Sequence, residues 1–272
     1  MLSATAGASA QDAPVERPVL SAYTLEVGGA QLAETYLSPL KYSGWSSALS
    51  YERMQAMRFN PNRWVIRLRG RLSLDRTLNP AHNATMWGLG LDLGWGMMHR
   101  WPVAPRWTVM AGGSTDIDAG VLYNARNSNN PAAAKVSWTV NASAAAVFNS
   151  RIGRVPICAR YQAELPLTGI FFSPEYGELY YEIYLGNHKG LVRGAWPGNF
   201  FRLDNLATLD FRFGRTTLRT GYRCMIFSSK ASHIVTRRIT HSFVIGVTSE
   251  WLSLSAKGTK NLAEATIISS LY

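Results

Sequence analysis

The stretch Arg63-Trp-Val-Ile-Arg-Leu-Arg-Gly-Arg-Leu-Ser-Leu-Asp75 alternates between apolar and charged side chains. Successive side chains of a β-strand point to opposite faces of a sheet, so this alternation predicts a strand with one apolar and one charged face. A slip of one residue would exchange the faces, and the register is therefore strongly specified. The apolar face carries Trp64, Ile66, Leu68, Leu72 and Leu74, and the charged face carries Arg67, Arg69, Arg71 and Asp75.

The same alternation returns along most of the chain. Between Trp87 and Met97 every odd position is apolar, whereas the even positions hold four glycines and Asp92. Segments of this kind, separated by turns, are typical of a transmembrane β-barrel. We predict ten principal strands, with twelve as the alternative, at residues 21–36, 45–58, 63–75, 86–98, 106–120, 135–149, 154–165, 206–213, 217–227 and 235–249.

The predicted connections alternate between short turns and longer loops. Such asymmetry is expected of an outer-membrane barrel with its short turns in the periplasm, and an even strand count places both ends of the barrel there. The predicted fold is thus all-β: a transmembrane antiparallel up-and-down β-barrel with a largely filled polar lumen. The barrel domain is expected at 12–250, after a residual signal-peptide-like leader at 1–11 and before a C-terminal tail at 251–272 whose terminal Tyr272 resembles an outer-membrane assembly signal.

Composition agrees with a chain that crosses a membrane as strands. Of the 272 residues 47% are hydrophobic, mean hydropathy is −0.06, and no run of about 18 apolar residues could form a spanning helix. In hydrocarbon a closed barrel is the strand architecture that satisfies every backbone polar group. The net charge of +11 lies partly on alternating strand positions rather than in a basic helix or tail. We therefore expect anionic lipid headgroups as partners and no nucleic acid.

A soluble barrel or β-sandwich is the alternative fold, because it also alternates. In that fold the apolar parity would form the core and the charged parity the solvated surface. The two folds thus predict opposite orientations for the same residues.

Three blocks of the sequence resemble a known family. They are Glu34-Thr-Tyr-Leu-Ser-Pro-Leu-Lys-Tyr-Ser-Gly-Trp45, Phe172-Ser-Pro-Glu-Tyr-Gly177 and Thr216-Thr-Leu-Arg-Thr-Gly-Tyr222. Together they are similar to a family of uncharacterised outer-membrane proteins from Bacteroidetes, and the resemblance runs from about Ala22 to Val247. It implies an outer-membrane barrel and brings no established activity or catalytic residues.

The charged parity of the strands is the first candidate site. Charges inside a narrow lumen persist when they are paired or hydrated, so we predict an inward charge ladder. A ten-stranded interior is little wider than one filled by side chains, which argues against a general diffusion pore. The predicted ladder comprises Arg67, Arg69, Arg71, Asp75, Asp92, Asp116, Asp118, Glu164, Asp210, Arg212, Arg219 and Arg223.

The connection 166–205 is the second candidate site. It is long for a simple connection and too apolar to remain solvated, so it should pack over or into the barrel as a lid, a plug or a substrate-binding loop. Glu175, Glu178 and Glu182 would share one face of a helical turn, although the segment around Tyr180 also alternates like a strand. The predicted lid or binding residues are Phe172, Glu175, Tyr176, Tyr180, Tyr181 and Glu182.

The functional hypothesis is a non-enzymatic surface, accessory or binding barrel in the outer membrane, with membrane lipids and either lipopolysaccharide or other outer-membrane proteins as partners. One alternative is a rim-active hydrolase of lipid or peptide, for which His233, His241 and Asp116 are the residues to test. A second is a small anion-preferring channel that depends on Arg69. No metal ligand set, phosphate loop or cofactor motif is expected, because the five histidines lack paired spacing.

Overall fold

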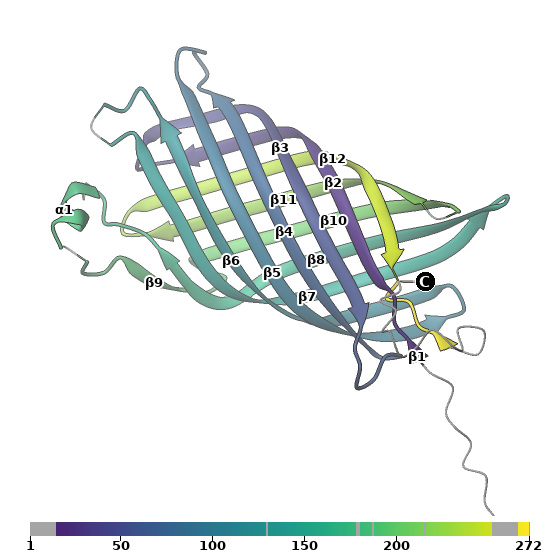
Figure 1. Cartoon of the computed structure of the whole chain (residues 1–272). Helices are drawn as coiled ribbons and strands as arrows, with labels where there is room; N and C mark the ends of the chain where they lie inside the picture. Colours follow the sequence, from purple (N-terminus) through teal and green to yellow (C-terminus); the bar gives the residue numbers. More distant parts are fainter. Residues whose placement is uncertain are drawn as a thin grey trace, which may run out of the picture.

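The computed structural model describes residues 15–128, 130–177, 180–186, 188–214, 216–251 and 266–271. The predicted leader, Tyr272 and most of the predicted tail lie outside these residues. Figure 1 shows a closed barrel of long, strongly tilted strands.

Ten strands form the barrel, which confirms the predicted all-β fold. Each pairs antiparallel with the next, β8 pairs with β10, and β12 pairs with β2 to close the sheet (Figure 1). The strands are β2 (Val19–Glu34), β3 (Ser38–Ala56), β4 (Trp64–Leu78), β5 (Thr85–Ala104), β6 (Trp107–Asn124), β7 (Ala132–Ile152), β8 (Val155–Phe172), β10 (Phe200–Phe213), β11 (Thr216–Ala231) and β12 (Ile234–Trp251).

Four short elements lie at the ends of the barrel. β1 (Val15–Glu16) pairs in parallel with β13 (Thr266–Ile267), and β9 (Val192–Ala195) pairs with the last residues of β8. The helix α1 (Tyr180–Tyr184) lies in the connection between β8 and β9. No helix in the described ranges is long and apolar enough to span a membrane.

All the barrel strands except β2 are longer than the sequence predicts. The predicted loop 166–205 is shorter at both ends, because β8 continues to Phe172 and β10 begins at Phe200. The predicted strands stop short of Pro39, Pro102 and Pro166, and proline cannot donate to the ladder. Each of these prolines lies beside a register shift in the sheet. A β-bulge tolerates proline, so the strand continues past it.

Inward glycines allow neighbouring strands to approach closely. A Cβ atom at Gly28 would lie 1.8 Å from the carbonyl oxygen of His241, and one at Gly112 would lie 2.0 Å from that of Met97. Real Cβ atoms do not come so close to backbone oxygen. These positions therefore require glycine if the sheet is to keep its curvature.

The exterior of the barrel carries the apolar parity. Leu72, Leu89 and Phe243 are 49, 50 and 56% exposed, as lipid-facing side chains are when no lipid is present. Aromatic pairs lie toward both ends of this surface, with Trp45 and Trp87 edge to face at 6.5 Å between ring centroids. An apolar band bounded by aromatic residues is the surface of a membrane-spanning barrel. The soluble alternative is therefore wrong, and the protein is an outer-membrane barrel in contact with lipid.

The two ends of the barrel differ. At the end that we name the turn end, short connections join β3–β4, β5–β6, β7–β8 and β10–β11, and the β1–β13 pair lies there (Figure 1). At the opposite loop end lie α1, β9 and the connection between β8 and β10. Outer-membrane barrels keep short turns in the periplasm, which supports the prediction that the loop end faces the outside of the cell.

Candidate functional site

The inward-facing side chains form distinct environments along the lumen. Apolar side chains occupy the turn end, and paired charges occupy the middle. Toward the loop end, a cavity lies beside a second apolar cluster that includes Leu32, Met86 and Leu122. Each environment has its own consequence for what the barrel can do.

Paired charges in the middle of the lumen form what we name the central network. It contains seven arginines and eight carboxylates of the described residues. The arginines are Arg67, Arg69, Arg71, Arg160, Arg202, Arg219 and Arg223, and the carboxylates are Glu26, Glu52, Asp92, Asp116, Asp118, Glu164, Asp204 and Asp210.

Glu52 is the carboxylate with the most cationic partners on the turn side of the network. It accepts from Arg67 Nε at 2.7 Å, from Arg160 Nη2 at 2.6 Å and from Arg219 Nη1 at 3.1 Å. Arg219 in turn donates to both carboxylate oxygens of Asp210, at 2.7 and 2.8 Å. One glutamate on β3 thereby ties together strands β4, β8 and β11.

Arg69 connects the middle of the network across the lumen. It donates to Asp116 on β6, to Glu164 on β8 at 3.0 Å and to Asp204 on β10 at 3.1 Å. Asp204 also receives two hydrogen bonds from Arg223. These bonds cross the lumen between opposite walls, so the middle of the barrel is filled by side chains rather than open.

The energetic value of this network lies in its completeness. Buried ion pairs add little net stability over apolar packing. Removal of one partner, however, leaves the other charge buried without a counter-charge, which costs about 3–5 kcal/mol. Charge-assisted hydrogen bonds to arginine also fix geometry. The network therefore holds the strands in one arrangement and blocks the lumen.

The turn end is closed by the chain itself. Leu271, which follows β13, lies 4% exposed in a cluster of inward apolar side chains. Its carbonyl oxygen accepts from Asn149 Nδ2 at 2.9 Å, and that of Ser269 accepts from Arg100 Nη1 at 2.6 Å. The cluster comprises Leu20, Met54, Val65, Met98, Met110, Ala145, Val147, Cys158 and Leu271.

Most of the predicted ladder lies in the central network, and two members lie elsewhere. Asp75 pairs with Arg238 at 2.7 Å on the loop side, and Arg212 pairs with Glu250 at 2.6 Å near the turn end. Sequence reasoning missed Glu26, Glu52, Arg160, Arg202 and Asp204 as ladder members. The strand parity around Leu25 and Val27 could have found Glu26, whereas Arg202 and Asp204 fell within the predicted loop.

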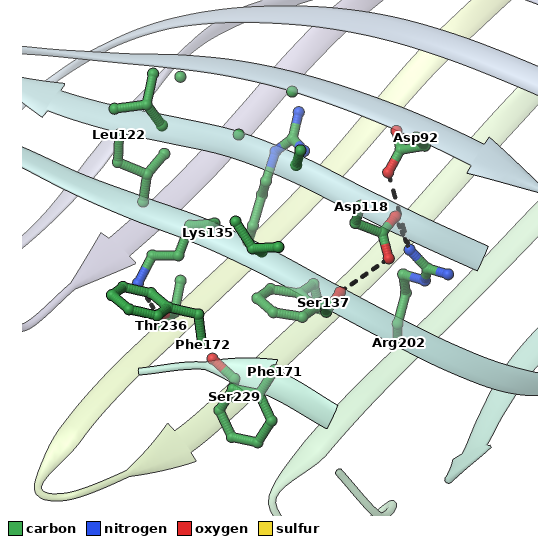
Figure 2. A pocket seen from close by; sticks show the side chains of 18 of the residues that line it. Asp92, Asp118, Leu122, Lys135, Ser137, Phe171, Phe172, Arg202, Ser229 and Thr236 are labelled. Carbon is green, nitrogen blue, oxygen red and sulfur yellow. Dashed lines mark hydrogen bonds and ion pairs between the residues drawn. The ribbon is translucent and has the colours of Figure 1, made fainter. Parts of the chain in front are cut away.

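A cavity of about 120 Å³ lies above the central network toward the loop end (Figure 2). One wall is aromatic: Phe171, Phe200 and Phe227 come from β8, β10 and β11, with ring centroids 5.2 Å apart in each neighbouring pair. Across the lumen, β5 and β6 present Gly88, Gly90 and Gly120. The space exists because glycines face the phenylalanines.

The floor of the cavity is the outermost part of the central network. Asp118 accepts from Ser137 Oγ at 3.0 Å and from Arg202, and Asp92 lies beside it (Figure 2). Asp92 and Asp118 are partners in the register of β5 and β6, and their side chains are 21 and 18% exposed. The floor thus presents two partly accessible carboxylates.

Two ion pairs line the sides of the cavity. Lys135 Nζ lies 2.6 Å from Glu34 Oε2 and donates to Thr236 Oγ1 at 3.0 Å. Arg238 pairs with Asp75, as described above. Both acids are buried and balance their cations, so the sides carry no net charge.

The connection from β8 to β9 lies at the loop end (Figure 1). Phe172 lines the cavity, and the ring of Tyr180 in α1 packs on Phe172 and on Tyr36. The Tyr180 hydroxyl accepts from the Ala134 amide at 2.7 Å, and burial raises the pKa of this phenol above its ordinary value of 10.0. The sequence predicts either a helical turn or a strand around Tyr180, and the structure shows the helical turn.

The other predicted lid residues point away from the cavity. Tyr176 and Tyr181 are each 66% exposed, Glu182 is exposed, and Glu175 pairs at 3.3 Å with Arg193. Glu178, which completed the predicted acidic face, lies outside the described residues. Of the predicted set, Phe172 and Tyr180 are thus the members associated with the cavity.

The residues proposed for a rim hydrolase are not brought together. His233 lies in the β11–β12 turn at the loop end, with φ of 66°. His241 lies on the outer face against Tyr222, whereas Ser242 beside it points inward. Asp116 is fully buried between Arg69 and Arg202. Within the described ranges, no group of three or more His, Cys, Asp or Glu side chains is arranged to hold a metal ion.

A family model and the solved structures place the chain among known proteins. Residues 1–258 match the model "Protein of unknown function (DUF3316)", so the chain belongs to that family. No curated protein matches it.

Several solved structures are similar. The outer membrane protease OmpT of Escherichia coli is 6% identical with a TM-score of 0.46, covering 86% of this chain and 97% of that chain. The translocator domain of the autotransporter NalP of Neisseria meningitidis is 10% identical with a TM-score of 0.41, covering 89% of this chain and 90% of that chain. An outer membrane channel of Pseudomonas putida F1 is 9% identical with a TM-score of 0.36, covering 92% of this chain and 100% of that chain. At this level, the similarities say nothing about the activity of this chain.

Proposed function

We propose that this outer-membrane barrel binds a small amphipathic molecule in the cavity at its loop end. The observation that carries the proposal is the cavity itself, with a phenylalanine wall, a charged floor and a partial lid at Tyr180. Small-molecule sites are concave and largely apolar, with a few placed polar groups that fix orientation. The sequence predicts a binding role in general, and the cavity supports a small molecule as the kind of ligand.

The same lumen argues against conduction. The central network crosses the barrel beneath the cavity, and Leu271 closes the turn end. Arg69, the residue on which an anion channel would depend, is fully engaged with three carboxylates. In planar bilayers we expect no stable conductance steps. Steps that become smaller in Arg69→Met would instead support the channel alternative.

Hydrolysis at the rim is also disfavoured. A base must lie within hydrogen-bond reach of the nucleophile, and His233, His241 and Asp116 occupy three separate environments. We therefore propose a non-enzymatic role. Turnover of a lipid or peptide substrate that is lost in His233→Ala, with the barrel still folded, would overturn it.

Gly90→Leu tests the proposed function by filling the cavity. A Cβ at Gly90 would meet the Ser73 hydroxyl at 2.9 Å, which can rotate away. The matched control is Gly70→Leu, which adds the same side chain to the outer face of β4, where the nearest atom is Leu93 Cδ2 at 3.6 Å.

The measurement is a ligand-observed NMR screen of small aromatic and alkyl fragments, both charged and neutral, against protein in nanodiscs. We expect fragments that bind the wild type and Gly70→Leu but not Gly90→Leu. Heat-modifiable migration on detergent gels checks that each variant still forms the barrel. The proposed function fails if no fragment of any charge distinguishes the wild type from Gly90→Leu.

Origin in Bacteroidetes remains a proposal, supported by the three blocks that resemble proteins of that group. Among partners, lipid contact follows from the apolar exterior. Lipopolysaccharide and other outer-membrane proteins remain proposed partners, for which the exposed Tyr181 and Tyr184 of α1 offer a contact surface.

A further inference from the structure

The cavity floor belongs to a network that has one carboxyl group more than it has arginines. Within the described part of the chain, the central network sets eight carboxylates against seven arginines. The two cations on the cavity sides do not restore the balance, because Lys135 and Arg238 are matched by the buried Glu34 and Asp75. The carboxyl group in excess therefore belongs to the network and its floor.

Asp92 is the carboxylate with the weakest cationic contacts. Its nearest partners are Arg71 Nη1 at 3.5 Å and Arg202 Nη1 at 3.8 Å. Strong charge-assisted hydrogen bonds to carboxylates are near 2.7–2.9 Å, which is the distance that Arg71 instead makes with Glu26, at 2.9 Å. Arg71 and Arg202 are thus committed to other acids, and Asp92 is left short of a cation.

The register places a second acid beside Asp92. Asp92 faces Asp118 across the β5–β6 ladder, and their carboxyl groups share a hydrogen bond, which requires one proton between them because like charges directly opposite each other are destabilising. Arg202 pairs with Asp118 and Asp116. A cation placed above Asp92, on its accessible cavity side, would take the place of that proton.

The aromatic wall indicates that the rest of the ligand is apolar. Phe171 and Phe200 are 5 and 4% exposed and, with Phe227, offer ring edges and faces to an apolar group. Aromatic faces also attract cations. A dry cavity of about 150 Å³ holds benzene, so a cavity of about 120 Å³ suits one small ring or a short alkyl chain.

We infer that the ligand is a small amphipathic cation: an ammonium group over Asp92 and Asp118, carried by an aryl or short alkyl group against the phenylalanine wall. This inference rests on the proposed function, since it names the ligand class for the same cavity. An anion would meet two carboxylates at the floor and find Lys135 and Arg238 already paired.

Three probes of nearly equal size and different charge test the inference: benzylamine, benzyl alcohol and benzoate. Each is titrated by calorimetry into protein in nanodiscs, with empty nanodiscs as the blank. We expect benzylamine to bind the wild type at least about tenfold more tightly than benzyl alcohol, and benzoate to bind least, because charge-assisted hydrogen bonds are stronger than neutral ones.

Asp92→Asn removes the charge with little change in shape. It should abolish most of the benzylamine preference while leaving benzyl alcohol unchanged, and Asp118→Asn serves as the second variant should Asp92→Asn fail to form a barrel. The control is Glu16→Gln, which removes one negative charge from β1 at the turn end. Control and wild type should bind all three probes alike.

The outcomes separate the two claims. A benzylamine preference that disappears in Asp92→Asn supports the ligand class. Equal binding of benzyl alcohol, tighter binding of benzoate, a preference that survives in Asp92→Asn, or no binding of any probe overturns the ligand class. In each of these cases the proposed function still stands if other fragments of the NMR screen bind the wild type but not Gly90→Leu.

Discussion

The turn end and the loop end of the lumen are both lined by the inward-facing side chains of the same strands. The turn end is closed, whereas the loop end contains a cavity. At the turn end, long apolar side chains such as Leu20, Met54 and Met98 meet in the middle, and Leu271 fills the remaining space. At the loop end, β5 and β6 present glycines opposite Phe171 and Phe200, and a cavity results. Side-chain size at equivalent inward positions therefore decides where a barrel of fixed width can bind a ligand.

The central network separates these two regions. It is polar and buried, and its outermost part is the cavity floor against which a ligand can rest. If this division is correct, changes in the network should affect the whole barrel, whereas changes at either end should stay local.

The largest expected effect belongs to Glu52→Gln. The substitution removes the charge that faces Arg67, Arg160 and Arg219, so buried guanidinium groups lose their counter-charge. We expect the free energy of unfolding to fall by about 3–5 kcal/mol, measured by urea titration in detergent micelles. Glu16→Gln, outside the lumen, should change it little. A shift in Glu52→Gln no larger than that of the control would contradict the structural role of the network.

A smaller effect is expected from Leu271→Ala at the turn end. Loss of a buried leucine side chain should cost about 2 kcal/mol, the low end for such truncations, because a chain terminus can relax. The same urea titration measures it. Bilayer conductance and fragment binding should be unchanged, because the central network still blocks the lumen. Conductance that appears in Leu271→Ala would show that Leu271, and not the central network, closes the barrel.

The smallest effect is expected from Tyr180→Phe at the loop end. The ring still packs on Tyr36 and Phe172, but the Ala134 amide loses its acceptor, at a cost of about 1 kcal/mol. Hydrogen exchange at that amide should accelerate about fivefold. Protection that stays unchanged would show that the ring packing alone holds the segment.

The packing of Tyr180, with its hydrogen bond from the Ala134 amide, should depend on pH. Burial raises the pKa of Tyr180 above 10.0, so an opened, solvated Tyr180 ionises first as pH rises. The packed arrangement of Tyr180 is therefore fully stable below pH 10 and loses stability above it. Exchange at the Ala134 amide, corrected for its intrinsic rise with pH, should show this loss in the wild type and not in Tyr180→Phe.

Much of the fold was predictable from local pattern alone. Alternation fixed all ten barrel strands and the face that each presents, because side-chain direction in a strand follows sequence position with period two. Strand ends were less predictable, since the bulges beside Pro39, Pro102 and Pro166 depend on the partner strand. Arg202 and Asp204 were missing from the predicted ladder because β10 begins at Phe200, inside the predicted loop 166–205.

The sequence by itself determined that this chain is a membrane barrel with charges inside, because parity is a local property of the backbone. Only the tertiary structure decided which charges meet, since the partners lie far apart in the chain: Glu52 and Arg160 are 108 positions apart, and Glu26 and Arg223 are 197. The cavity has the same origin. Glycines on β5 and β6 create a binding site only because closure of the barrel places phenylalanines from β8, β10 and β11 across the lumen from them.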